Sequence, residues 1–169
     1  SDGKGPLFGA VRVGEEKIVQ TLLKGGAEVD APLSMDHNGE AVGGCTALYI
    51  AALLGHLPSC KVLASSGASL EAANDLGYTP MMAAIEGDHE EVIDFFLKSG
   101  ANVNPDVTPS MEVEGLGGAF PLYTATRKEN LAVIKKLLKR GADVNRSAPN
   151  GWTSLKSAAQ QGNFEIVKV

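Results

Sequence analysis

The sequence lacks the features of a membrane-spanning, a disulfide-rich secreted or a nucleic-acid-binding protein. No apolar run in its 169 residues approaches the roughly 18 needed for a transmembrane helix, and no secretory signal is visible. Two cysteines, Cys45 and Cys60, are too few for a disulfide framework or a four-ligand zinc site. The formal charge of −5 disfavours neutralisation of nucleic-acid phosphates. We therefore expect no membrane insertion, no nucleic-acid partner and an intracellular protein, cytoplasmic or nuclear.

Aromatic residues and catalytic motifs are also scarce. Aromatics make up 5% of the chain, whereas glycines number 20, so we expect a core of small and aliphatic side chains. The sequence has no phosphate-binding Gly-x-x-x-x-Gly-Lys-Ser/Thr loop, no Gly-x-Gly-x-x-Gly and no Gly-x-Ser-x-Gly. We predict neither enzyme activity nor a cofactor, a metal site or a small-molecule substrate.

What the chain does contain is an internal repeat. A short segment with a leucine or methionine at its third position and an alanine at its sixth recurs at residues 5–10, 46–51, 79–84, 120–125 and 153–158. A second segment, of the type Gly-Ala-x-Val-Asn, recurs at 26–30, 67–71, 100–104 and 141–145. The successive starts differ by 41, 33, 41 and 33 residues. A fixed period in this range indicates a repeat architecture.

The pattern resembles that of ankyrin repeats, whose period is 33 and whose signature is Thr-Pro-Leu-His-x-Ala. Thr79-Pro80, Gly87-Asp88-His89 and the segments 92–97 and 100–104 carry the resemblance best. It implies an all-α solenoid of about five stacked helix-turn-helix units, forming a single domain over residues 1–169. It also implies that the protein binds another protein or peptide through a concave surface. Because both ends lack a polar cap, we expect a fragment of a longer protein, and a monomer.

Local signals are consistent with a helix pair in each unit. Thr46 and Thr79 are good N-cap residues, whereas Gly5 and Phe120 lack the capping hydroxyl. Apolar residues spaced by three and four predict the second helix of a pair. A left-handed glycine is expected to end the second helices, at positions 26, 67, 100 and 141.

The units depart from the signature in two ways. The signature histidine is replaced in every unit, by Phe8, Tyr49, Met82, Tyr123 and Lys156, and we expect packing to take over its role. Two segments, 31–44 and 105–118, are eight residues longer than their counterparts and are predicted to form long loops on one edge. Met35 and Met111 in these loops are candidate contacts with a partner, or they fold back onto the solenoid.

The resemblance places the other candidate partner-binding residues on the turns and first helices. They are Arg12, Val13, Leu53, Leu54, Tyr78, Glu86, Arg127, Lys128, Trp152, Gln160 and Gln161. Leucine, tyrosine and tryptophan would be the apolar anchors. Leu53 and Leu54 can instead pack against the neighbouring unit, and Trp152 can simply cover the last one.

Charge is distributed unevenly along the chain. Residues 71–114 contain ten acidic residues and one basic residue, whereas residues 127–146 contain seven basic residues and two acidic ones. This pattern orients a bipolar ligand, or it marks two solvated outer faces. For Arg127 and Lys128 we predict the binding groove, and for Lys135, Lys136 and Lys139 an outer face.

A few single residues have alternative roles. His56 and His89 share one repeat position, which predicts a structural role. Cys45 follows a turn that can face a partner, but no electropositive surroundings favour a reactive thiol. Asn104 and Asn145 are expected to support turns, although ankyrin-like repeats are sometimes hydroxylated at such asparagines. Two other functions remain open: a regulatory or targeting arm of a larger enzyme or channel, and a structural spacer.

Overall fold

The computed structural model describes residues 5–32, 43–106, 120–148 and 151–168, and these form ten helices in five pairs, called repeats 1 to 5. The first helices of the pairs are α1 (Pro6–Val13), α3 (Ala47–Leu53), α5 (Pro80–Glu86), α7 (Pro121–Arg127) and α9 (Ser154–Gln161). The second helices are α2 (Glu16–Lys24), α4 (Leu57–Ser65), α6 (Glu90–Lys98), α8 (Leu131–Lys139) and α10 (Phe164–Val167). The predicted all-α repeat fold is confirmed.

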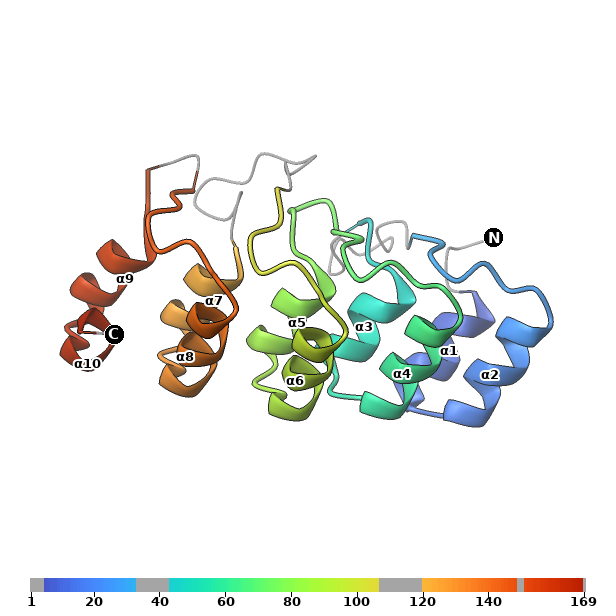
Figure 1. The fold of residues 1–169 in the computed structure, drawn as a ribbon. Helices are drawn as coiled ribbons and strands as arrows, with labels where there is room; N and C mark the ends of the chain where they lie inside the picture. The colour runs from blue at the N-terminus through green and yellow to red at the C-terminus, as the bar shows by residue number, and fades with distance from the viewer. Residues whose placement is uncertain (1–4, 33–42, 107–119, 149–150, 169) are drawn as a thin grey trace.

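The pairs stack in chain order. Each first helix packs against its own second helix and against the first helix of the next repeat. Among the second helices, α2 packs against α4, and α4 packs against α6. Figure 1 shows the resulting row of helix pairs, with α1 and α2 at one end and α9 and α10 at the other. Most of the predicted long loops, including Met35 and Met111, lies outside the described residues.

The first helices begin where the sequence predicts. The hydroxyls of Thr46 and Thr79 accept hydrogen bonds from the backbone N–H three residues later, at 3.2 and 3.5 Å. Thr153 caps α9 in the same way. Gly5 and Phe120 provide no capping bond to α1 and α7, so in both helices proline in the first turn is the remaining start signal.

Left-handed glycines follow four of the second helices, as predicted. Their φ angles lie between +83° and +92°, a region that residues with a Cβ enter only at a cost; they are Gly26, Gly67, Gly100 and Gly141. Each lies one position beyond the C-cap residue, where such glycines end helices. The chain therefore leaves each of these helices at a fixed point and turns toward the next repeat.

The core is built from small and aliphatic side chains, which confirms the expectation from composition. The first helices contribute alanines that are fully buried, among them Ala51, Ala52, Ala83, Ala84 and Ala125. Small side chains let neighbouring first helices approach closely. The second helices contribute larger buried groups to the same core, such as Leu63, Phe96 and Leu137.

Candidate partner-binding surface

The structure divides the predicted site residues between the two ends of the first helices. Tyr78 and Trp152 precede α5 and α9, whereas the other candidates in the described residues lie in the last turns or just after them. A seven-residue helix is about 10 Å long. The two groups therefore mark opposite borders of one side of the row formed by α1, α3, α5, α7 and α9. We call this surface the first-helix face.

One end of this face is apolar. Val13, Leu53 and Leu54 expose 74%, 36% and 42% of their surface. Their helices are held side by side, because the Nδ1 atom of His56 lies 2.8 Å from the carbonyl oxygen of Val11. Of the two roles open to Leu53 and Leu54, the structure shows the exposed one. Three bulky aliphatic side chains thus lie in solvent on neighbouring repeats.

Tyr78 differs from its predicted role as an exposed anchor. Only 8% of it is accessible, because it packs with Met82, Leu76, Tyr49 and Tyr123. We call these five residues the inner-face cluster. Burial raises the pKa values of Tyr78 and Tyr49. Within this group, tyrosine or methionine fills the signature-histidine position of repeats 2, 3 and 4, where packing takes the place of the histidine. In repeat 5 the expectation is wrong, because Lys156 is exposed and donates a hydrogen bond to the oxygen of Gly151.

Glu86 and Arg127 come together on this face. They form an ion pair between the ends of α5 and α7. Gln161 donates a hydrogen bond of 3.0 Å to the backbone oxygen of Arg127. Lys128 is exposed, and Trp152 is partly exposed. Arg127 therefore reaches a partner only in competition with Glu86.

The uneven charge distribution has a structural use that sequence reasoning missed. Acidic residues of repeat 3 pair with basic residues of repeat 4, and the ion pairs are Arg127–Glu86, Lys136–Glu90, Lys136–Asp94 and Arg146–Asp106. We call this set of four the charge ladder. The 41-residue spacing between repeats 3 and 4 could have indicated these pairs, because it brings residue 86 next to residue 127. Several of these charged side chains thus connect repeat 3 with repeat 4.

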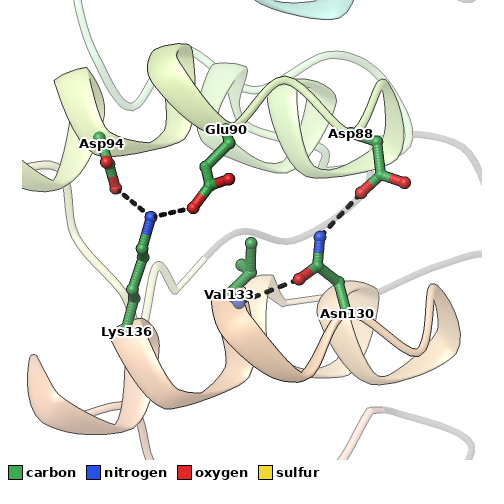
Figure 2. Close-up of polar contacts among 6 residues, drawn as sticks. All are labelled: Asp88, Glu90, Asp94, Asn130, Val133 and Lys136. Carbon is green, nitrogen blue, oxygen red and sulfur yellow. Dashed lines mark hydrogen bonds and ion pairs between the residues drawn. The ribbon is translucent and has the colours of Figure 1, made fainter.

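Lys136 is the central residue of the charge ladder. Its Nζ atom lies 2.6 Å from a carboxylate oxygen of Glu90 and 2.7 Å from one of Asp94, as Figure 2 shows. Hydrogen bonds to Asp94 and Glu90 raise the pKa of Lys136. Beside them, Asn130 donates a bond of 2.8 Å to Asp88 and caps α8 by accepting one from the N–H of Val133. The prediction that Lys136 lies on an outer, second helix is correct, but its head group contacts repeat 3.

Both repeated histidines have the predicted structural role. His56 bonds to the carbonyl oxygen of Val11 in the preceding repeat, and the Nε2 atom of His89 lies 3.0 Å from that of Leu53. Asn104 is structural as well. Its side chain bonds to the oxygen of Gly141 and to the N–H of Asp143, at 2.8 and 2.9 Å. These contacts tie neighbouring repeats together.

Both cysteines are buried. Cys45 exposes 5% of its surface and Cys60 none, so the expected exposure of Cys45 is wrong. Burial raises the pKa of the Cys45 thiol and that of Cys60, the latter to about 12. Both thiols are therefore protonated at neutral pH, which opposes redox reactivity.

An apolar cleft of about 250 Å³ lies between repeats 4 and 5. Leu122, Ile134, Leu138, Leu155 and Val167 are among its lining residues. It lies beside α10 of repeat 5, which contributes Ile166 and Val167 to the lining. The cleft is thus a gap in packing between two repeats. Elsewhere in the described segments, no cluster of three metal-ligating side chains occurs, and no helix is long and apolar enough to cross a bilayer.

Comparison with known families agrees with this architecture. The family model for ankyrin repeats, of three copies, matches residues 7–107 and again residues 108–169. The chain belongs to the ankyrin-repeat family. Ankyrin repeats generally mediate protein–protein interaction and are typically non-catalytic.

Individual relatives are larger proteins of diverse kinds. A putative ankyrin repeat protein of Rickettsia felis is 29% identical over 142 residues, which cover 84% of this chain and 42% of that protein. The B-cell lymphoma 3 protein homolog of Mus musculus is 29% identical over 168 residues, which cover 96% of this chain and 34% of that protein. The potassium channel AKT1 of Arabidopsis thaliana is 34% identical over 94 residues, which cover 56% of this chain and 10% of that protein. The chain thus spans less than half the length of each.

Proposed function

We propose that this ankyrin-repeat domain is a non-catalytic, intracellular binding module that holds another protein or peptide against its first-helix face. The observation that carries the proposal is the exposure of Val13, Leu53 and Leu54 on neighbouring helix ends. Exposed apolar groups that cluster on one face are typical of interaction sites. Lys128, Gln160 and Gln161 continue the same border with polar groups, which suit the rim of an interface.

The Glu86–Arg127 pair divides this surface into two parts. Repeats 1 and 2 offer aliphatic side chains, whereas repeats 4 and 5 offer a lysine and two glutamines. We infer that a partner places an apolar segment on repeats 1 and 2 and a polar or acidic segment near Lys128. Arg12, exposed beside Val13, provides a second cation for an acidic group.

A peptide selection tests the proposal. Peptides from a random display library are selected on the folded wild-type domain and then measured against Leu54→Asp, with Ile18→Asp as the matched control. Ile18 is 49% exposed but lies on a second helix. We expect Leu54→Asp to weaken the selected peptides at least tenfold, and Ile18→Asp to leave their affinity unchanged. Equal losses in both variants, or no loss with Leu54→Asp, would contradict the proposal.

A second candidate function is that of a regulatory or targeting arm of a larger protein. It is favoured by the alignment of this chain with a tenth of the potassium channel AKT1 and a third of the B-cell lymphoma 3 homolog. In that case the first-helix face binds a segment of the same polypeptide. The same Leu54→Asp change would then alter the activity of the whole protein rather than capture of a separate partner.

A further inference from the structure

The boundary between repeats 3 and 4 differs in chemistry from the other boundaries. Within the described segments, the ion pairs that connect different repeats all belong to the charge ladder. The remaining ion pair, Lys168–Glu165, lies within one short segment. Repeat 3 therefore contacts repeat 4 through ion pairs, in addition to the hydrogen bonds of Asn104, Asn130 and Arg140 across the same boundary.

The neighbouring boundaries use other contacts. His56 joins repeats 1 and 2 through the carbonyl oxygen of Val11, and His89 joins repeats 2 and 3 through that of Leu53, at 2.8 and 3.0 Å. These rings lie against backbone, and α2 packs directly on α4, as α4 does on α6. Such contacts depend less on ionic strength than ion pairs of partly exposed side chains do.

At the boundary of repeats 3 and 4, the two layers of helices are joined differently. In the first-helix layer, Tyr123 packs in the inner-face cluster with Tyr78 and Met82. In the second-helix layer, Lys136 bridges from α8 to Glu90 and Asp94 on α6 (Figure 2). The apolar contacts of Tyr123 do not weaken with added salt, whereas the Glu86–Arg127 pair at the ends of α5 and α7 does. The charged layer weakens as well, because Lys136 is 30% exposed and its partners are 64% and 39% exposed.

We propose that this boundary is a salt-sensitive hinge. When ionic strength rises, the ion pairs between α6 and α8 weaken while the contacts of Tyr123 with Tyr78 and Met82 persist. Repeats 4 and 5 then rotate relative to repeats 2 and 3 about the first-helix layer, and the second helices separate. The Glu86–Arg127 pair lies at the same boundary, so the rotation also changes the spacing of the two parts of the first-helix face.

A distance measurement by electron paramagnetic resonance tests the hinge in the full chain. Spin labels at Lys61→Cys and Lys139→Cys span the boundary, and labels at Lys17→Cys and Glu91→Cys form a reference pair within repeats 1 to 3. All four positions are exposed on second helices. The native Cys45 and Cys60 are buried, which directs labelling to the introduced thiols. Distances are compared at 0.1 M and 1 M NaCl, where the Debye length falls from about 10 to about 3 Å.

We expect the Lys61–Lys139 distribution to shift to longer distances and broaden at 1 M NaCl, and the reference pair to stay unchanged. Lys136→Met keeps the aliphatic stem but removes the charge, so this variant should show the long distribution already at 0.1 M. Lys135→Met makes the same change at an exposed neighbouring position and should behave like the wild type. A salt-independent wild-type distance, an equal shift in the reference pair, or equal effects of the two methionine variants would overturn the hinge.

Discussion

At the residue scale, the position that ends each first helix shows how one repeat constrains the next. Gly14 and Gly55 have positive φ angles of 78° and 74°. A Cβ atom on Gly55 would lie 2.5 Å from Nδ1 of His89, and one on Gly14 would lie 3.1 Å from a ring carbon of His56. Glycine is therefore required at these positions for two reasons. Only glycine adopts the positive φ angle without strain, and a Cβ atom would clash with the histidine of the following repeat.

Gly55→Ala should destabilise the domain more than Gly67→Ala. Both glycines are left-handed, with φ angles of 74° and 92°, but nothing lies within 4 Å of a Cβ added at Gly67. The backbone cost of about 1–2 kcal/mol is common to both variants, and displacement of His89 adds to it only in Gly55→Ala. Urea unfolding measures the difference. Equal free energies of unfolding would show that His89 moves aside without cost.

At the scale of elements, the boundary between α6 and α8 has an acidic residue, and not a glycine, at the left-handed position. Asp88 and Glu129 occupy the left-handed position of repeats 3 and 4, with φ angles of 59° and 54°. Their carboxylates accept hydrogen bonds from Asn130 and Asn163 of the next repeats, at 2.8 and 3.1 Å. In repeats 3 and 4, an acidic residue at the left-handed position thus pairs with an asparagine of the next repeat. In repeats 1 and 2, a glycine at this position lies against a histidine of the next repeat. Each asparagine also caps its own helix.

Asn130→Asp should lower the free energy of unfolding by about 1 kcal/mol at neutral pH, the net worth of one hydrogen bond. The new carboxylate still caps α8, but it cannot donate to Asp88 and repels it. The double variant Asp88→Asn/Asn130→Asp should recover most of the loss, because the amide then donates from position 88 and asparagine tolerates the left-handed angle. Chemical denaturation of the two variants and the wild type checks this. A double variant as unstable as the single one would contradict the pairing.

At the scale of the whole molecule, stability in a solenoid is a sum over repeats and their neighbouring interfaces. In this chain of 169 residues, repeat 5 has few buried contacts, because Phe164 and Val167 of α10 are exposed by 74% and 40%. Repeat 3 contributes most to the core, since every residue of α5 from Pro80 to Ile85 is buried. Local opening is therefore expected to begin at repeat 5.

Hydrogen exchange should show this gradient directly. We expect the amides of α9 and α10 to exchange at least tenfold faster than those of α3 and α5 under native conditions, because fewer buried contacts hold repeat 5. Exchange followed by mass spectrometry at neutral pH measures both regions in one sample. Protection of α9 equal to that of α5 would contradict a stability that decreases toward repeat 5.

The sequence alone determined the fold, because repetition makes local signals agree. Capping threonines, first-turn prolines and left-handed glycines recur in register, and each acts within a few residues of chain. They predicted the helix pairs, and the repeated histidines were correctly assigned a structural role. Exposure was harder to predict. Tyr78 and Leu53 are both apolar candidates on one face. Packing with Met82 buries Tyr78, whereas Leu53 keeps 36% of its surface exposed.

Only the tertiary structure decided what the charges do. The acidic stretch and the basic stretch are separate in the sequence, and either one alone reads as a solvated face. Stacking places residues 41 to 46 positions apart against each other, so Glu86 meets Arg127 and Lys136 meets Glu90. A contact of this kind depends on the direction of two side chains from different helices. Local sequence patterns fix the helices, but the register between repeats fixes which charges meet.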